Sequence, residues 1–533
     1  MRWRFRTSTS NYRAARLIAR QSLLLAALAA AALLTPAMGA ETPAPTAASV
    51  GAAAVARPDI FDVIERARQA LLADKYEEAG KALDEALKMP EFEELDESAQ
   101  FRVFLFSSLA ARGREDYLGA HEFIMVATKF PEATADHFLM RARYASWVDA
   151  WSDGAAALVT VGKRWPDSLA KADPELISLT AHRMNRDGQH KAERLELLNA
   201  LFDAKYKLEW GLQPDGFWED LILDALARND LKRARELNRR VESTSTLTHM
   251  RIDRRFDALV NADARSFDLT AAAERQHKRL AKVVSANPRS LGARVQYGYA
   301  LLEVGRFEEV LTLANSVIAR VTAAKAKSLP YDDIADNLNW IYNHKAAALR
   351  SLGRWDEAIA VMEAGKNERE QGSDNVSQSI NLGMHYIEYG RPQDALKALD
   401  GIDWAHSLSP YGRMQLQHVR YRAYLQLANA SEAEGVLAYL REHHEDAEAT
   451  WQNALLEGGD VEGAAALLIS RLHDSEKRGG ALEEIQDYKP LPRLPRMQEA
   501  NQRWQALIAR ADVTAAINAV GRREQLPLYS VPD

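Results

Sequence analysis

A few clusters of histidine, serine and carboxylate residues have spacings that metal-dependent or hydrolytic chemistry uses. The His-Glu pair at His121 would begin an HExxH zinc motif, but Met125 stands where the second histidine is needed. The run HHED at residues 443–446 offers four ligands, yet neighbouring residues on a helix point about 100° apart, which favours a solvated turn over a metal site. Ser168 and Lys171 have the spacing of the SxxK motif without its companion motifs. We therefore expect no metal site and no catalytic residue here.

Two charged clusters could instead serve acid–base chemistry or binding. Five carboxylates lie between Glu91 and Glu97, but acid–base work needs one of them desolvated, and so dense a run is more typical of an exposed connection. Lys232, Arg235 and Arg239 lie at offsets 0, 3 and 7, which is one stripe of a helix. This stripe is either a patch for an anionic partner, such as a phosphorylated glycan or an acidic protein, or a solvated outer face.

The remaining signatures of catalysis are missing from the sequence. Neither a phosphate-binding loop, a dinucleotide fingerprint nor a GxSxG elbow occurs in its 533 residues. The chain has no cysteine, which excludes thiol catalysis, disulfides and cysteine-ligated metals. We therefore expect no cofactor. With 47% hydrophobic residues and few β-branched runs, the composition favours a large all-α core.

The segment from Leu338 to Met362 contains the element that recurs along the chain. Apolar residues from Leu338 to Leu349 lie at offsets 0, 4, 8 and 11 and form one face of a helix. Gly353 ends this helix, and a second apolar face starts at Trp355 with offsets 0, 3, 4 and 7. Two short helices joined by a glycine turn form an αα-hairpin.

The second-helix pattern returns repeatedly and predicts a series of hairpins. It begins again at Tyr76, Phe307, Pro392 and Val461, each time shortly after a turn signal at Asp74, Gly305, Gly390 or Gly459. Prolines at positions 90, 131 and 166 each follow an anchoring alanine by 11 residues, so we expect the second helices of the first three hairpins to have equal lengths.

The LGRWDEA segment at residues 352–358 resembles the tetratricopeptide repeat (TPR), a 34-residue hairpin with small residues where two helices cross closely. Equivalent positions recur every 31–48 residues here, apart from one gap of 76 that predicts an unrecognised hairpin between residues 243 and 287. The resemblance implies an all-α solenoid of ten to twelve stacked antiparallel hairpins, a TPR-like superhelix.

In TPR arrays the first helix of each hairpin lines a concave groove that holds an extended peptide or a partner helix. The resemblance places seven candidate binding residues on that surface: Gln296, Tyr299, Asn343, His344, Arg350, Asn381 and Met384. Amide side chains can pair with the N–H and C=O groups of an extended peptide. Val295 and Tyr299 replace the Lys and Asn of carboxylate-binding TPRs, so the resemblance does not extend to that clamp.

The first 40 residues have the features of an export signal. They contain six arginines and no acid, followed by an apolar run from Leu23 to Leu34 and then small residues. An organelle transit peptide is the alternative, which the dense Leu/Ala block disfavours because transit peptides are amphipathic. We expect a cleaved signal peptide at residues 1–40 and a bacterial protein that is periplasmic or secreted. Without those arginines the chain has 62 basic against 75 acidic residues, so no nucleic-acid partner is expected.

The chain can be divided from these patterns. After the signal peptide we expect a flexible linker at 41–57, N-terminal hairpins at 58–242, a degenerate hairpin at 243–290 and C-terminal hairpins at 291–480. Residues 481–533 should contain a proline-containing break, a capping helix and a loose tail. No segment after the signal has 18 consecutive apolar residues, so we predict no transmembrane helix in the mature chain.

Three functional hypotheses follow. The first is a non-enzymatic exported scaffold that binds a protein or peptide partner in envelope assembly, secretion or polymer export. The second is a polysaccharide-processing enzyme with a superhelical body, whose acids would lie in the irregular windows 243–287 and 470–533. The third is a fixed subunit of one obligate complex. The absence of a catalytic signature favours the scaffold.

Overall fold

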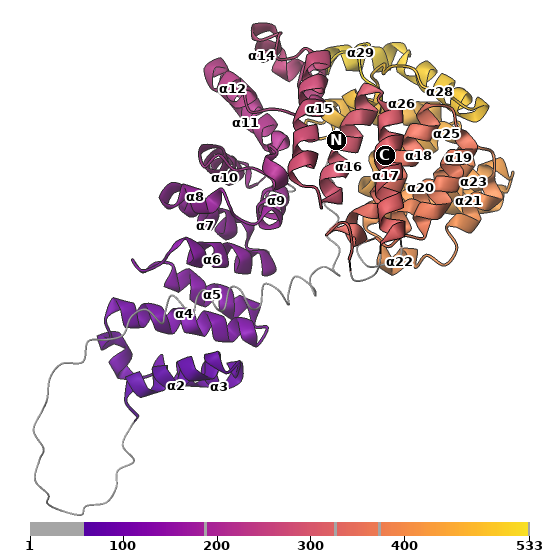
Figure 1. Cartoon of the computed structure of the whole chain (residues 1–533). Helices are drawn as coiled ribbons and strands as arrows, with labels where there is room; N and C mark the ends of the chain where they lie inside the picture. Colours follow the sequence, from indigo (N-terminus) through magenta and orange to yellow (C-terminus); the bar gives the residue numbers. More distant parts are fainter. Residues whose placement is uncertain (1–57, 186–188, 325–327, 371–374, 531–533) are drawn as a thin grey trace, which may run out of the picture. The chain divides into compact units, whose positions relative to one another are not determined.

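The structure is a computed structural model that describes residues 58–185, 189–324, 328–370 and 375–530. The predicted signal peptide and linker lie outside these residues. The described chain is all-α, with helices in stacked antiparallel pairs and two isolated β-bridges (Figure 1). The predicted solenoid of helix hairpins is therefore confirmed. No helix of the described part is long and apolar enough to cross a membrane.

The described chain forms two compact units, residues 58–212 and residues 213–530. The division falls inside the hairpin series that the sequence placed at 58–242. The first unit contains α2 (Ile60–Leu72), α3 (Tyr76–Ala86), η1 (Pro90–Glu94), α4 (Glu97–Gly113), α5 (Tyr117–Ala127), α6 (Ala135–Trp147), α7 (Trp151–Arg164), α8 (Pro166–Leu169), α9 (Pro174–Arg183), α10 (Lys191–Asp203) and η2 (Glu209–Gly211).

The second unit is longer and begins with the irregular helices around residues 243–290. Its first half contains α11 (Asp215–Ala227), α12 (Leu231–Asn238), α13 (Thr244–Ile252), η3 (Arg254–Phe256), α14 (Asp257–Ala262), α15 (Leu269–Ala286), α16 (Leu291–Val304), α17 (Phe307–Ala323), α18 (Ile334–Ser351) and α19 (Trp355–Lys366). Its second half contains α20 (Val376–Glu388), α21 (Pro392–Ala398), α22 (Trp404–Ser407), α23 (Pro410–Gln426), α24 (Ala430–Glu442), η4 (His444–Asp446), α25 (Glu448–Glu457), α26 (Val461–His473), α27 (Arg478–Glu484), α28 (Pro495–Ile508) and α29 (Ala511–Val520).

Most hairpins turn on a single residue with left-handed backbone geometry. In the first unit this residue is Asp74, Glu115 or Asp149, and in the second it is Asn229, Gly305, Gly353, Gly390, Ala428 or Gly459. The second helices start where the sequence placed them, for example at Tyr76 after Asp74 and at Trp355 after Gly353. One left-handed residue ends the first helix and reverses the chain, which explains why the turn signals and apolar offsets located the hairpins.

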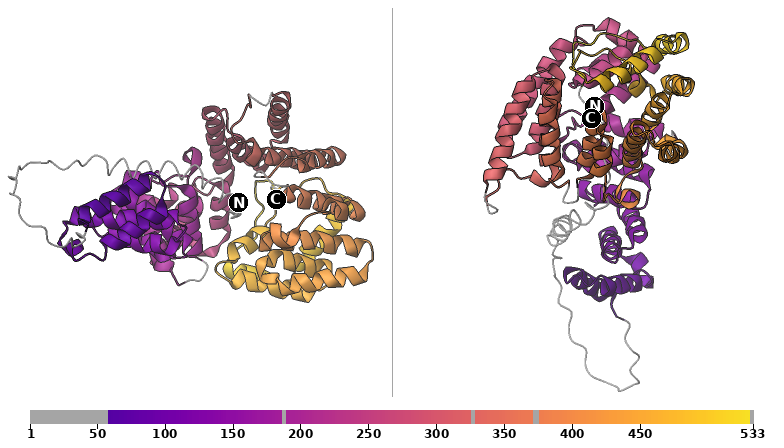
Figure 2. Two further views of the ribbon diagram at one scale, coloured as in Figure 1. Left: turned by 90° about the horizontal axis from the view of Figure 1, so that it is seen from below. Right: turned by 90° about the vertical axis from the view of Figure 1, so that its right-hand side faces the viewer.

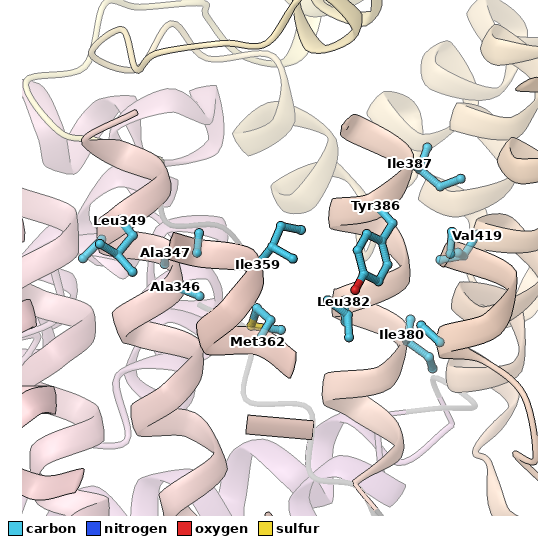
Figure 3. Packing of buried hydrophobic residues seen from close by; sticks show 14 of the residues in the cluster. Ala346, Ala347, Leu349, Ile359, Met362, Ile380, Leu382, Tyr386, Ile387 and Val419 are labelled. Carbon is cyan, nitrogen blue, oxygen red and sulfur yellow. The ribbon is translucent and has the colours of Figure 1, made fainter. Parts of the chain in front are cut away.

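Apolar side chains from neighbouring hairpins pack together in shared clusters. Figure 3 shows the part built by α18, α19, α20 and α23, where Leu349, Met362, Ile387 and Val419 are at most 2% exposed. Burying each such side chain contributes about 1.5–3 kcal/mol. One hairpin alone cannot cover its own apolar face, so the stack holds the pairs together.

The helix series of the second unit returns on itself (Figure 2). Helix α13 contacts α27, and Ile252 at the end of α13 packs in one cluster with Leu482 and Val513. The N–H of Arg522 donates to the carbonyl of Ile252 at 3.0 Å. A repeat array normally needs separate caps for its two ends; here the early and late helices of the unit cover each other.

The C-terminal tail, residues 521–530, is ordered although the sequence predicted a loose tail. The N–H of Leu526 donates to the carbonyl of Asp487 at 2.8 Å, and the N–H of Lys489 donates to the carbonyl of Leu528 at 2.8 Å. Leu526 and Leu528 are 3% and 2% exposed. Their burial beside the segment at residues 487–489 explains why Pro527 does not leave this part of the tail free.

The proline-rich segment, residues 487–496, and the tail lie against the turns of three successive hairpins. A Cβ atom at Gly305 would lie 2.3 Å from the Tyr529 ring, and one at Gly390 would lie 2.8 Å from Nε of Arg496. At Gly353 the nearest neighbour is Pro492. Glycine at position 305 therefore serves both a positive φ of 81° and a close approach of the tail.

Candidate functional site

Three of the predicted binding residues occupy equivalent positions in neighbouring hairpins. Gln296, His344 and Asn381 lie on the first helices α16, α18 and α20, each nine residues before the left-handed glycine of its hairpin. The helices are brought together in part by Gln378 of α20, whose amide donates to the Asn339 carbonyl of α18 at 3.4 Å. The three residues thus form a row that runs across the hairpins.

The outer members of this row have polar groups to offer. Gln296 and Asn381 are both partly exposed, and neither side chain forms a hydrogen bond within the described part of the chain. A primary amide carries two N–H donors and one carbonyl acceptor, so each residue can pair with both groups of a peptide unit. These two side chains are the clearest candidates for direct contact with an extended ligand.

The middle member, His344, has a packing role. It is 2% exposed, burial lowers its pKa to about 3, and both ring nitrogens lack a partner among the described residues. Its ring packs edge-on against Tyr299 with centroids 4.3 Å apart. A Cβ at Gly298 would lie 2.4 Å from Nδ1 of His344, so α16 and α18 meet closely at this glycine. The neutral histidine and Tyr299 fill the space between the helices.

A row of paired charges follows the same helices and includes another predicted residue. Arg350 Nη2 of α18 lies 2.7 Å from Glu388 Oε2 of α20, and the two side chains are 13% and 18% exposed. Farther along, Arg422 Nε of α23 lies 3.0 Å from Glu457 Oε1 of α25. The Glu457 carboxylate also accepts from His418 at 2.8 Å. These ion pairs connect successive hairpins, so Arg350 is already engaged.

The carboxylates in this row are held ionised. Burial alone would raise the pKa of Glu388, but the positive charge of Arg350 and the bond with His385 outweigh it and lower the pKa to about 2. Arg422 adds to this effect from the next hairpin. The pKa of Glu457 is also lowered, because His418 and Arg422 overcome its desolvation.

The other two predicted groove residues are buried or in contact with a neighbour. Asn343 is 5% exposed within α18. Met384 is partly exposed, and the guanidinium of Arg422 approaches its sulfur. Sequence reasoning missed Glu388 and Glu457, although both lie two residues before the turn glycine. That recurring position was the signal that could have found them.

The predicted basic stripe lies on α12 and just beyond it. Lys232, Arg235 and Arg239 are all exposed. The Arg235 guanidinium donates to the Ala262 carbonyl at 3.0 Å, which leaves Lys232 and Arg239 facing solvent or other ligands. Arg239 also lines a cavity described below.

The candidates for metal binding and acid–base chemistry have structural surroundings. Nε2 of His121 lies 2.8 Å from the Asp153 carboxylate, which Arg141 also contacts. The His443 ring packs against Tyr439 with centroids 4.2 Å apart. Within the described ranges, no three His, Asp or Glu residues come close enough together to hold a metal ion. The acidic run spans η1 and the start of α4, where Asp96 accepts a hydrogen bond from the Ala99 N–H at 2.7 Å.

Titratable side chains come together where the two irregular windows of the second unit meet, and Glu219 of α11 and Glu303 of α16 lie in the same region. Nε2 of His249 lies 2.8 Å from Glu483 Oε2 across the contact between α13 and α27. Burial raises the pKa of Glu219 to about 7, partly offset by the His249 charge. Burial also raises the pKa of Glu303 to about 7, and the Glu483 charge adds to the shift. This group has the residue types of an acid–base site.

Comparison with known proteins gives structural matches only. No family model and no curated protein matches the chain. Among solved structures it is similar to the Cut9–Hcn1 hetero-tetramer of the APC/C, with 12% identity over 86% of this chain and 84% of that chain and a TM-score of 0.27. It is also similar to Naa15/Naa10 bound to HypK-THB, with 13% identity, coverage of 84% and 73% and a TM-score of 0.23. The TPR domain of P58(IPK) matches with 12% identity, coverage of 78% and 100% and a TM-score of 0.17.

The repeated hairpins, their left-handed turns and their shared register belong to the chain itself. It is a helical repeat protein built of stacked antiparallel hairpins. Its first helices α16 and α20 carry two amides, Gln296 and Asn381, that have no hydrogen-bond partner among the described residues, and ion pairs connect later first helices.

Proposed function

We propose that this protein is a non-enzymatic, exported scaffold that binds an extended segment of a protein partner along the first helices α16, α18 and α20. The observation that supports this most is the placement of Gln296 and Asn381. They carry amides without a hydrogen-bond partner in the described ranges, at the same register position of two hairpins, on either side of His344. An extended peptide needs such donors and acceptors at intervals along its backbone.

The neighbouring contacts suit this surface to binding with little loss of freedom. The ion pair between Arg350 and Glu388 joins α18 to α20, two of the three helices, before a partner arrives. A preorganised surface spends less free energy on ordering when it binds. Because these charges neutralise one another, recognition depends on the amides and on shape more than on a carboxylate clamp.

The cellular setting is part of the proposal. The arginine-rich start and apolar run within residues 1–40 support export, and a chain without cysteine suits an oxidising compartment because it has no thiol to oxidise. A periplasmic scaffold of this kind would act in envelope assembly, secretion or polymer export.

The proposal is tested by affinity purification of the full chain from the periplasm of its native host. The variant Gln296→Ala/Asn381→Ala should lose a stoichiometric protein partner that the wild type retains. The matched control is Asn315→Ala/Gln393→Ala, which removes two exposed amides from the second helices α17 and α21 of the same hairpins. Equal recovery of the partner with both double variants would contradict the proposed surface.

The group around His249 and Glu483 supports an alternative, a polysaccharide-processing enzyme. A partly exposed acid with a pKa near 7, such as Glu219, can act as a general acid at neutral pH. If periplasmic glycan is cleaved by the wild type and not by Glu219→Gln with intact helicity, the enzyme replaces the scaffold as the function.

A fixed subunit of an obligate complex would instead aggregate or dimerise when purified alone.

A further inference from the structure

A cavity of about 350 Å³ lies among α12, α13 and the connection from α14 to α15 in the second unit. Three arginines line it from different segments: Arg239 just after α12, Arg265 in the connection and Arg275 in α15. Only the first belongs to the basic stripe that the sequence revealed. Folding therefore gathers two further arginines that are distant from the stripe in the chain.

These three arginines differ from their neighbours because no ion pair engages them within the described residues. Nearby arginines are paired, as Arg233 is with Glu236, Arg279 with Glu242 and Arg306 with Glu274. The cavity thus holds three guanidinium groups that form no ion pair within the described residues, on a chain that is acidic overall.

The rest of the lining sets the charge and shape of the cavity. Asp263 is its one carboxylate, and the Ser266 hydroxyl donates to it at 2.7 Å. Three arginines and one aspartate give the lining a net charge of +2. Val241 and Leu247 add apolar surface and are 9% and 3% exposed.

One further polar group lines the cavity. Asn238 is 4% exposed, and its side-chain oxygen has no hydrogen-bond partner in the described part of the chain. A buried acceptor without a partner costs roughly 1–3 kcal/mol, and because this oxygen has almost no accessible surface, the cost falls on the fold and not on a ligand. The lining therefore offers a ligand cationic and apolar contacts.

We propose that this cavity binds a small organic phosphate monoester. A phosphate monoester carries a charge of about −1.5 to −2 near pH 7, which matches the lining. A guanidinium group binds phosphate oxygens through two parallel hydrogen bonds. A phosphate group has enough oxygens to accept from several arginines, whereas a carboxylate ligand has only two oxygens. The volume lies within the range of about 300–1,000 Å³ that holds small molecules, leaving room for an organic part against Val241 and Leu247.

The test is isothermal titration calorimetry on the full chain with glucose 1-phosphate, inorganic phosphate and glucose. We expect saturable binding of glucose 1-phosphate, weaker binding of inorganic phosphate and none of glucose. The double variant Arg239→Gln/Arg275→Gln should weaken binding at least tenfold. The control Lys232→Gln/Lys278→Gln removes the same charge from exposed positions of α12 and α15 and should change binding less than twofold.

Several outcomes would overturn the proposal. The proposal is wrong if no phosphate compound binds saturably. It is also wrong if both double variants weaken binding equally, because the arginines would then act only through the overall surface charge. Equal affinities for glucose 1-phosphate and inorganic phosphate would show that the cavity does not recognise the organic part of the ligand. Cosedimentation with vesicles that contain phosphatidic acid, without binding of glucose 1-phosphate, would place the phosphate on a lipid. Circular dichroism of both variants confirms that they are folded.

Discussion

The ionised carboxylate of Glu388, which Arg350, His385 and Arg422 stabilise together, should make a large contribution to stability, and its size follows from the structure. Glu388 has a pKa of about 2 in the folded chain against a reference value of 4.5. Linkage converts this difference into about 3 kcal/mol of stability at neutral pH. Both side chains are largely buried, so solvent screens the interaction little. The substitution Glu388→Gln should therefore lower the free energy of unfolding by about 3 kcal/mol at pH 7.

The pH dependence has a defined sign. Since folding depresses the pKa of Glu388, its contribution is present above a pH of about 4.5 and is lost as the pH falls toward about 2. The difference between wild type and Glu388→Gln should accordingly shrink to less than half by pH 3. Urea denaturation at pH 7 and pH 3, followed by circular dichroism, measures both quantities.

An exposed pair of the same geometry provides the control. Arg354 Nη2 lies 2.7 Å from Glu357 Oε2, the same distance as in the buried pair, but these side chains are 43% and 59% exposed. Solvent and salt screen such a pair, so Glu357→Gln should leave stability unchanged within error. If the two substitutions cost the same, or if the cost at Glu388 does not depend on pH, then burial of the ion pair is not what stabilises the hairpin contact.

Three further predictions concern packing and processing. Gly298→Ala places a Cβ against His344 and should destabilise the chain by about 1–3 kcal/mol in thermal or urea unfolding; Gly435→Ala, in α24 with no atom within 4 Å, should instead stabilise it by about 0.5–1 kcal/mol. Tyr529→Ala removes the ring that packs on Phe307 and Gly305, and hydrogen exchange in the turn between α16 and α17 should accelerate; unchanged exchange would show that the tail does not hold this turn. N-terminal sequencing of the protein from its host should begin near residue 41, whereas a start at Met1 would contradict the cleaved signal.

The sequence allowed the hairpins to be predicted because their signals are local. A glycine turn, such as Gly353, and apolar residues at helical offsets lie within one hairpin, and α19 starts at the predicted Trp355. The closure of the second unit could not be read in this way. Ile252 meets Leu482 and Val513 across more than 200 residues, and no short pattern records that contact.

In the candidate site, too, local patterns could be predicted from the sequence and contacts between hairpins could not. Register placed Gln296, His344 and Asn381 in one row, since each lies nine residues before its turn glycine. Whether a side chain is free or engaged depends on the next hairpin, so the pairing of Arg350 with Glu388 required the structure. The cavity arginines were hidden for the same reason, because they come from separate segments.

The central claim is that a protein partner binds along the first helices α16, α18 and α20. Photo-crosslinking in the native host tests it most directly, with a photoreactive residue placed at Gln296, Asn381, Asn315 or Gln393. We predict that positions 296 and 381 on the first helices crosslink to the same protein and that positions 315 and 393 on the second helices do not. Crosslinks from the second helices alone, or from all four positions equally, would contradict the claim.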